Sequence, residues 1–169
     1  STYDAVQLDV LRDGVPHLIF TDATPADFEF KTEIPAELAE YTFRLLGVKD
    51  QLRYLEAEAC DVVAGDVYLI QGQSNAVAGT AFFTDHAYLY HTTPFVRNFG
   101  LKTGPDSLLI WHKENGAASN YADNKSGQWG LILGKNIVDN YGIPVAIING
   151  AISGISIDSM MPEPNKPAD

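Results

Sequence analysis

The sequence predicts a mixed α/β protein in two parts: a β-rich segment over residues 1–65 and an open parallel sheet over residues 66–169. Two short, nearly uninterrupted apolar runs, 67–70 and 145–148, are typical of parallel strands buried on both faces. Apolar residues at helical spacing precede the second run. Charge divides the chain as well. The first part has 13 Asp and Glu against 5 Lys and Arg, a net charge of −8, whereas the second has 9 against 6, a net of −3.

Alternating apolar residues and turn signals predict antiparallel strands in the first part. Strands are expected at Tyr3–Leu11, His17–Phe20 and Leu52–Cys60, with a turn at Asp13-Gly14. The short segment Ala36–Phe43 fits either a helix or extended chain. Turns about every 8–12 residues favour a small antiparallel sandwich, or part of one whose first strands precede this chain.

The second part has the pattern of a strand–helix–strand unit. A helix is expected over Gly127–Tyr141, where five apolar residues recur at helical spacing: Trp129, Ile132, Leu133, Ile137 and Val138. Gly142 is a suitable C-cap, and Pro144 prevents the helix from continuing. This order is typical of an open parallel α/β sheet. A third parallel strand is expected near Ser107–Trp111.

Composition excludes several classes of protein. With 46% hydrophobic and 20% charged residues, the chain is neither disordered, collagenous nor a coiled coil. No run approaches the ~18 uncharged apolar residues that a membrane span needs. The net charge of −11 repels phosphate backbones, which argues against a nucleic-acid partner. The single Cys60 excludes an internal disulfide and a multi-cysteine zinc site.

The segment Asp66–Ala76 carries the strongest chemical signal. An apolar strand ends at Gly72, Ser74 follows, and small residues begin what reads as a helix. In α/β sheets, ligands gather at the carboxyl ends of strands, where this serine is expected. Backbone N–H groups at a helix start can stabilise an oxyanion. The spacing is equally compatible with Ser74 as an ordinary N-cap.

The run Gly72-Gln-Ser-Asn75 after an apolar strand resembles the first conserved block of SGNH hydrolases. Glutamine before the serine resembles the branch of sialate O-acetylesterases and acetylxylan esterases. The resemblance continues through Phe95–Gly100, Gly127–Gly130 and Ile143–Ile157, and so covers most of residues 60–160. It implies a flavodoxin-like three-layer α/β/α sheet, incomplete in this chain, and a secreted or periplasmic bacterial protein.

The resemblance also implies roles for individual residues. Ser74 would be the nucleophile, and its own N–H one oxyanion donor. Gly154, after the second apolar run, would supply another donor, although an ordinary turn glycine would look the same. Gln73, Asn75 and Arg97 are candidate substrate-binding residues, with a structural salt bridge as an equal alternative for Arg97. No metal and no organic cofactor are implied.

The general base of the family is missing from the sequence. The family has a third-block asparagine and a late Asp-x-x-His, but no Asp here has a His three residues later. The four histidines are expected to be packing or surface residues, with His112 the best outside candidate for the base: His17, His86, His91 and His112. A serine needs a base. We therefore expect a continuation beyond Asp169, or a second polypeptide, to complete the esterase domain.

The sequence thus predicts a serine esterase that removes acetyl groups from carbohydrate. One alternative is a non-catalytic carbohydrate-binding or structural fragment. Another is a lipase- or thioesterase-like SGNH hydrolase, disfavoured because no long apolar stretch suits an acyl chain. Trp111 and Trp129 either stack on a sugar ring, or one faces the core and the other has a structural role. Glu114 and Asp123 as a glycosidase pair are discounted, because nothing holds them at a useful separation.

Overall fold

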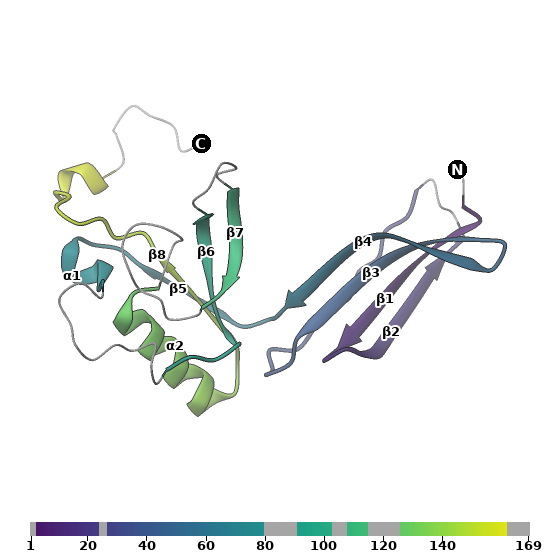
Figure 1. Ribbon diagram of the computed structural model, residues 1–169, viewed down its shortest axis with the longest axis horizontal. Helices are drawn as coiled ribbons and strands as arrows, with labels where there is room; N and C mark the ends of the chain where they lie inside the picture. The colour runs from purple at the N-terminus through teal and green to yellow at the C-terminus, as the bar shows by residue number, and fades with distance from the viewer. Residues whose placement is uncertain (1–2, 24–26, 80–90, 103–107, 115–125, 162–169) are drawn as a thin grey trace. The chain divides into compact units, whose positions relative to one another are not determined.

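The computed structural model describes residues 3–23, 27–79, 91–102, 108–114 and 126–161. The chain divides into two units, Ser1–Ala64 and Gly65–Asp169. Each unit contains one four-stranded sheet, and the described helices belong to the second unit (Figure 1). The protein is therefore a mixed α/β protein with two sheets.

The first sheet is antiparallel throughout, in the order β2-β1-β3-β4. Its strands are β1 (Ala5–Arg12), β2 (Val15–Asp22), β3 (Tyr41–Lys49) and β4 (Leu52–Val62). The strands expected at Tyr3–Leu11, His17–Phe20 and Leu52–Cys60 are confirmed as β1, β2 and β4. Asp13 and Gly14 both have positive φ, 50° and 78°, which suits a two-residue hairpin turn between right-twisted strands.

The described residues of this unit form one sheet, so they contain no complete sandwich, and the alternative of part of a sandwich stays a prediction. The hydrophobic core of this unit lies between the strands and the connection from β2 to β3. The buried members are Val10, Ala39 and Tyr41, with Leu8, Leu18, Phe20, Ile34, Phe43 and Val62 packed against them. The irregular connection between β2 and β3 thus contributes to the core in the place of a second sheet. Of the two alternatives for Ala36–Phe43, the helix is wrong, since β3 begins within this segment.

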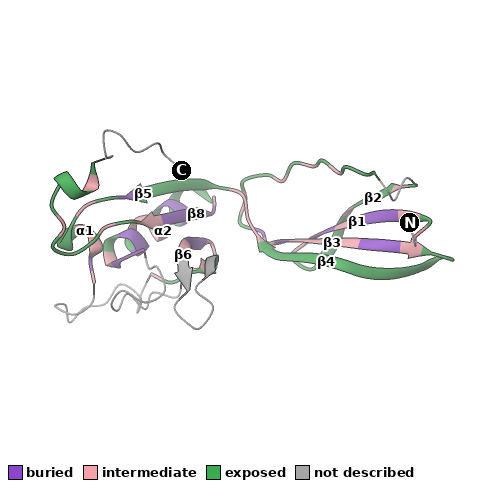
Figure 2. Cartoon of the chain, turned by 90° about the horizontal axis from the view of Figure 1, so that it is seen from above, coloured by how far each residue is buried: buried purple, intermediate pink, exposed green. Residues whose placement is uncertain are grey.

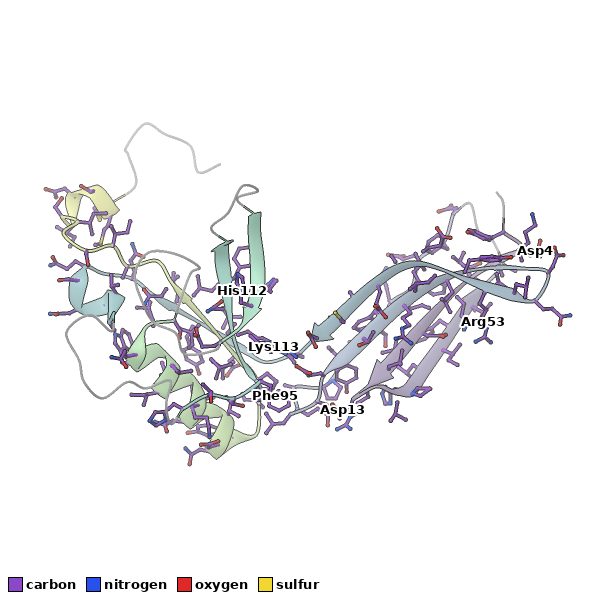
Figure 3. The ribbon with its side chains drawn as sticks, in the orientation of Figure 1. Asp4, Asp13, Arg53, Phe95, His112 and Lys113 are labelled. Atoms are coloured by element: carbon purple, nitrogen blue, oxygen red, sulfur yellow. The ribbon has the colours of Figure 1, made fainter. Side chains whose placement is uncertain are left out.

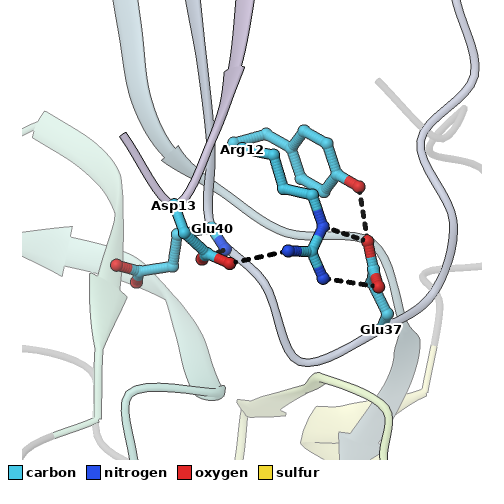
Figure 4. Close-up of polar contacts among 5 residues, drawn as sticks. Arg12, Asp13, Glu37 and Glu40 are labelled. Carbon is cyan, nitrogen blue, oxygen red and sulfur yellow. Dashed lines mark hydrogen bonds and ion pairs between the residues drawn. The ribbon is translucent and has the colours of Figure 1, made fainter. Parts of the chain in front are cut away.

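A polar cluster fastens the connection to the end of β1 (Figure 4). Arg12 Nε and Nη2 donate to Glu37 Oε1 and Oε2, each at 2.8 Å, and Tyr41 Oη donates to Glu37 Oε1 at 2.6 Å. Arg12 Nη1 pairs with Asp13 Oδ2 at 3.0 Å. The hydrogen bonds from Arg12 and then Tyr41 lower the pKa of Glu37 to about 2. Hydrogen bonding to Glu37 raises the pKa of both Arg12 and Tyr41.

The second sheet is mixed, in the order β5-β8-β6-β7. Its strands are β5 (Asp66–Ile70), β6 (Val96–Lys102), β7 (Leu108–Lys113) and β8 (Val145–Asn149). The apolar runs 67–70 and 145–148 are confirmed as parallel neighbours. The strand expected near Ser107–Trp111 exists as β7, but it runs antiparallel to β6, so its predicted direction is wrong. The connecting residues 103–107 are too few for a parallel crossover, which needs about a dozen.

Helix α2 (Gln128–Tyr141) packs on β8 and β6 and confirms the expected helix (Figure 1). It ends as the sequence indicates: Gly142 is left-handed, and its N–H donates to Val138 O at 2.9 Å. Gly130 and Gly134 let the helix approach closely, since a Cβ on either would lie 3.0 Å from Ile70 or Val96. Of the helices among the described residues, none is both long and apolar enough to cross a membrane.

Strand β5 is more exposed than its sequence suggests (Figure 2). Val67, Tyr68 and Leu69 are exposed, Leu69 by 71%, whereas Ile70 is buried. The expectation of burial on both faces is therefore wrong for β5, whereas Val145, Ala146 and Ile147 of β8 are buried. The reason lies in the strand order: β5 is an edge strand, and α2 packs over β8 and β6 instead.

Candidate active site

Ser74 is the first residue of α1 (Ser74–Val77), which follows β5 after a three-residue loop. The residue is exposed. α1 is a single turn in which Val77 N donates to Gln73 O at 3.0 Å and Ala78 N donates to Ser74 O at 3.3 Å. The N–H of Ser74 lies before the point at which a helix offers an internal acceptor. It is therefore available, as far as α1 itself is concerned, to a group bound beside Ser74.

The loop after β8 runs beside the loop after β5. Gly150 N donates to Ile70 O at 2.9 Å, and Ile152 N donates to Gly72 O at 3.0 Å. Gly154 follows in the same loop, exposed and with φ +76°, a conformation that favours glycine. The structure thus brings the segments that carry Ser74 and Gly154 to the same edge of the sheet. A shared oxyanion site between their N–H groups stays a prediction.

The other candidate site residues divide into two groups. Gln73 and Asn75 flank Ser74 and are exposed, so both are accessible, and their contact with a substrate stays a prediction. Arg97 instead pairs with Ala146, three residues before Asn149 at the carboxyl end of β8. Three residues of strand place Arg97 about 10 Å from the carboxyl end of β8, measured along the strand. Arg97 is also only 5% exposed. Its position therefore gives no support to substrate contact.

The histidines do not provide a base in the described contacts. His17 belongs to β2 of the first unit, His91 precedes β6, and His86 lies outside the described residues. His112 is on β7 (Figure 3), opposite Asn98 on β6, and its Nε2 is buried. The hydrogen bonds between described residues join the Ser74 loop to the start of α2 and the end of β8, and none of those bonds involves a histidine.

Asn149 is a residue of this region that sequence reasoning missed. It ends β8, and its Nδ2 donates to Ala76 O at 3.0 Å and to Ser126 O at 3.1 Å. Its Oδ1 accepts from Ala151 N at 3.0 Å. One side chain thus joins the Ser74 helix, the start of α2 and the loop that leads to Gly154. The available signal was an amide residue placed where an apolar strand ends.

Glu114, half of the discounted glycosidase pair, is buried, with 5% of its surface exposed. Its Oε2 accepts from Asn98 Nδ2 at 2.7 Å and from Ser126 N at 3.0 Å. The backbone of Ser126 thus has two side-chain partners: its N–H donates to Glu114, and its carbonyl accepts from Asn149. Asp123, the other half of the discounted glycosidase pair, lies outside the described residues. The contacts of Glu114 are those of a structural carboxylate.

Both tryptophans are exposed, Trp111 by 57%. Neither tryptophan therefore faces the core in the described structure, and a structural role for one of them stays open. Trp111 contacts Phe99, with ring centroids 5.0 Å apart. Among the described residues, no group of three His, Cys, Asp or Glu side chains is arranged to hold a metal ion.

These observations define a mixed α/β protein whose second sheet presents a serine at the carboxyl end of a parallel strand. No protein-family model matches the chain, and no curated protein matches it significantly. Among solved structures, the chain is similar to a carbohydrate acetylesterase from Xanthomonas citri, with a TM-score of 0.53 and 20% sequence identity. The match covers 95% of this chain but 37% of that esterase. At this identity the similarity establishes the fold.

Proposed function

We propose that this chain carries the nucleophile part of a carbohydrate O-acetylesterase of the SGNH type, in the branch of sialate O-acetylesterases and acetylxylan esterases. The observation that carries the proposal is the juxtaposition of two loops: Ser74 follows β5, Gly154 follows β8, and backbone hydrogen bonds join the loops before each residue. The fold similarity to a carbohydrate acetylesterase supports an acetylated carbohydrate as the substrate class. The flavodoxin-like α/β/α arrangement is part of the same proposal.

The proposed reaction is a two-step acyl transfer. A general base takes the hydroxyl proton as Ser74 Oγ attacks the acetyl carbonyl carbon, and the bond to the sugar oxygen breaks as the base gives that proton to the sugar oxygen. Water then hydrolyses the acyl-enzyme and restores the serine. The N–H groups of Ser74 and Gly154 donate to the tetrahedral oxyanion in both steps. Gln73 and Asn75 flank the nucleophile and contact the substrate.

Further polypeptide is proposed to supply the general base and a third oxyanion donor. Two observations support this. The chain spans 37% of the similar esterase. In addition, β5 lies at the edge of the sheet formed by the described residues, with Val67 and Leu69 exposed, so it offers an edge and apolar surface to another strand. A secreted or periplasmic location belongs to the proposal on the strength of the resemblance alone.

The test is S74A in the full-length gene product, assayed with p-nitrophenyl acetate and with acetylated sugars. Loss of a catalytic nucleophile lowers kcat by about 10⁴-fold or more. S156A is the matched control, because Ser156 is an exposed serine in the loop after Gly154 whose Oγ lies 3.0 Å from Ser159 Oγ. S156A should keep both the rate and the melting temperature. Full activity in a folded S74A protein would assign the nucleophile elsewhere, and a wild-type protein that binds but never hydrolyses acetylated sugars would support the non-catalytic alternative.

One observation favours the lipase- or thioesterase-like alternative as a second candidate. Ile152, Ile157 and Met161 are exposed in the segment around Gly154. These are single exposed side chains, so the expectation that no long apolar stretch suits an acyl chain stays a prediction. A series of p-nitrophenyl esters separates the two candidates: an acetylesterase loses kcat/KM from acetate to butyrate to octanoate, whereas a lipase-like enzyme gains it.

A further inference from the structure

We infer that Asn149 is a positioning residue that fixes the nucleophile loop against the oxyanion loop; the inference deepens the proposed function and rests on it. Its side chain contacts three segments that are distant in sequence, through Ala76, Ser126 and Ala151. Two of these segments carry Ser74 and Gly154. The third begins α2, the helix that packs on the core of the sheet.

The amide of Asn149 is matched to its surroundings. Its two N–H bonds point to two carbonyl groups, Ala76 O and Ser126 O, and its oxygen accepts from the Ala151 N–H. Only an amide in this orientation satisfies all three partners, because a carboxylate has no donors and a hydroxyl has one. The position therefore requires asparagine chemistry and not merely a polar side chain.

The neighbouring contacts show what the side chain holds in place. Gln128 N donates to Ala78 O at 3.0 Å, and a Cβ on Gly127 would lie 2.5 Å from Val77 O. The end of α1 is thus pressed directly against the start of α2, with no room for a side chain between them. Ser126 is itself fixed by Glu114. Asn149 links this fixed point to the end of α1, two residues beyond Ser74.

Displacement of α1 would move Ser74 Oγ relative to the N–H of Gly154. The nucleophile and the oxyanion donor must converge on one acetyl group, so relative displacement impairs the transition state more than ground-state binding. A misplacement of about 1 Å is enough to cost about 100-fold in rate. The expected signature is a lower kcat with little change in KM.

The experiment uses N149D in the full-length gene product. Aspartate keeps the acceptor for Ala151 N but turns an oxygen towards two carbonyl oxygens, so the bonds to Ala76 and Ser126 are lost. The matched control is N140D, since Asn140 Nδ2 also donates to a backbone carbonyl, Asn136 O at 2.7 Å, but on the exposed side of α2. N149D should lower kcat by about 10- to 100-fold with KM within about threefold. N140D should change neither.

Hydrogen exchange supplies a readout that does not depend on activity. In N149D, amide exchange should accelerate over residues 74–78 and 150–154 and stay unchanged in β1–β4. If N149D does not fold, N149A replaces it, because alanine removes the same contacts without adding a charge. A folded variant with wild-type kcat and unchanged exchange over those residues would overturn the inference. If S74A retains activity, the proposed function fails instead, and the exchange result alone decides whether Asn149 holds the two loops.

Discussion

The sharpest stability prediction concerns Ile147, the point where α2 meets the second sheet. Ile147 is fully buried, in a cluster with Val96, Leu131 and Val145 among others. I147A removes three carbon atoms, about 2.4 kcal/mol at about 0.8 kcal/mol for each. The cavity adds to this, and substitutions of this kind range over about 2–5 kcal/mol. The residues of α2 that approach Ile147 include two glycines, which cannot fill the space, so we expect about 3–5 kcal/mol.

Urea unfolding followed by tryptophan fluorescence measures this loss. Both tryptophans, Trp111 and Trp129, belong to the second unit, so the signal reports on that unit. Y141A is the matched control, because Tyr141 is 75% exposed at the end of α2, and its loss should stay within about 0.5 kcal/mol. A loss below about 1 kcal/mol for I147A, or equal losses for both variants, would refute the described packing of α2 on β8.

Two further predictions concern the first unit and the start of the second. The pKa of Glu37 lies near 2, below the ordinary value of 4.5, so its interaction with Arg12 stabilises the fold above about pH 4.5 and is lost as the pH falls towards 2. Thermal melts of E37Q should therefore show a flatter dependence of stability on pH between about 4.5 and 2. An unchanged slope would contradict this prediction. A Cβ on Gly65 would lie 1.9 Å from Pro144 O, so G65A should destabilise the second unit by about 1–3 kcal/mol. The control is G79A, which should keep the wild-type melting temperature because a Cβ on Gly79 meets no atom within 4 Å.

Local signals explain which elements were predictable from the sequence. The apolar runs at 67–70 and 145–148 and the helix ending at Gly142 need no distant residue for recognition. Strand β6 was missed because Arg97 and Asn98 interrupt its apolar pattern. Both side chains are buried. Asn98 Nδ2 donates a hydrogen bond to Glu114, the residue that follows β7. A buried polar pair of this kind leaves no periodicity in the sequence.

The candidate site shows the same division. The position of Ser74 follows from one strand and the loop after it, so a single segment of sequence indicates it. The contacts of Asn149 depend instead on three groups, at Ala76, Ser126 and Ala151, that only the tertiary structure brings together. Exposure of β5 was likewise hidden, because an apolar run does not reveal whether its strand is central or at an edge. The roles proposed for Ser74 and Gly154 remain predictions.

The pairing of β5 with β8 has a consequence during protein synthesis. Asp66 pairs with Val145, 79 residues later in the chain (145 minus 66). At roughly 5–20 residues per second, a ribosome needs about 4–16 s to add that length. For an interval of this length after it leaves the ribosome, the strand that precedes Ser74 has no β8 with which to pair. Such delayed, long-range pairing slows folding and exposes apolar segments to aggregation. The strand that leads to Ser74 therefore spends seconds as an unpaired apolar segment.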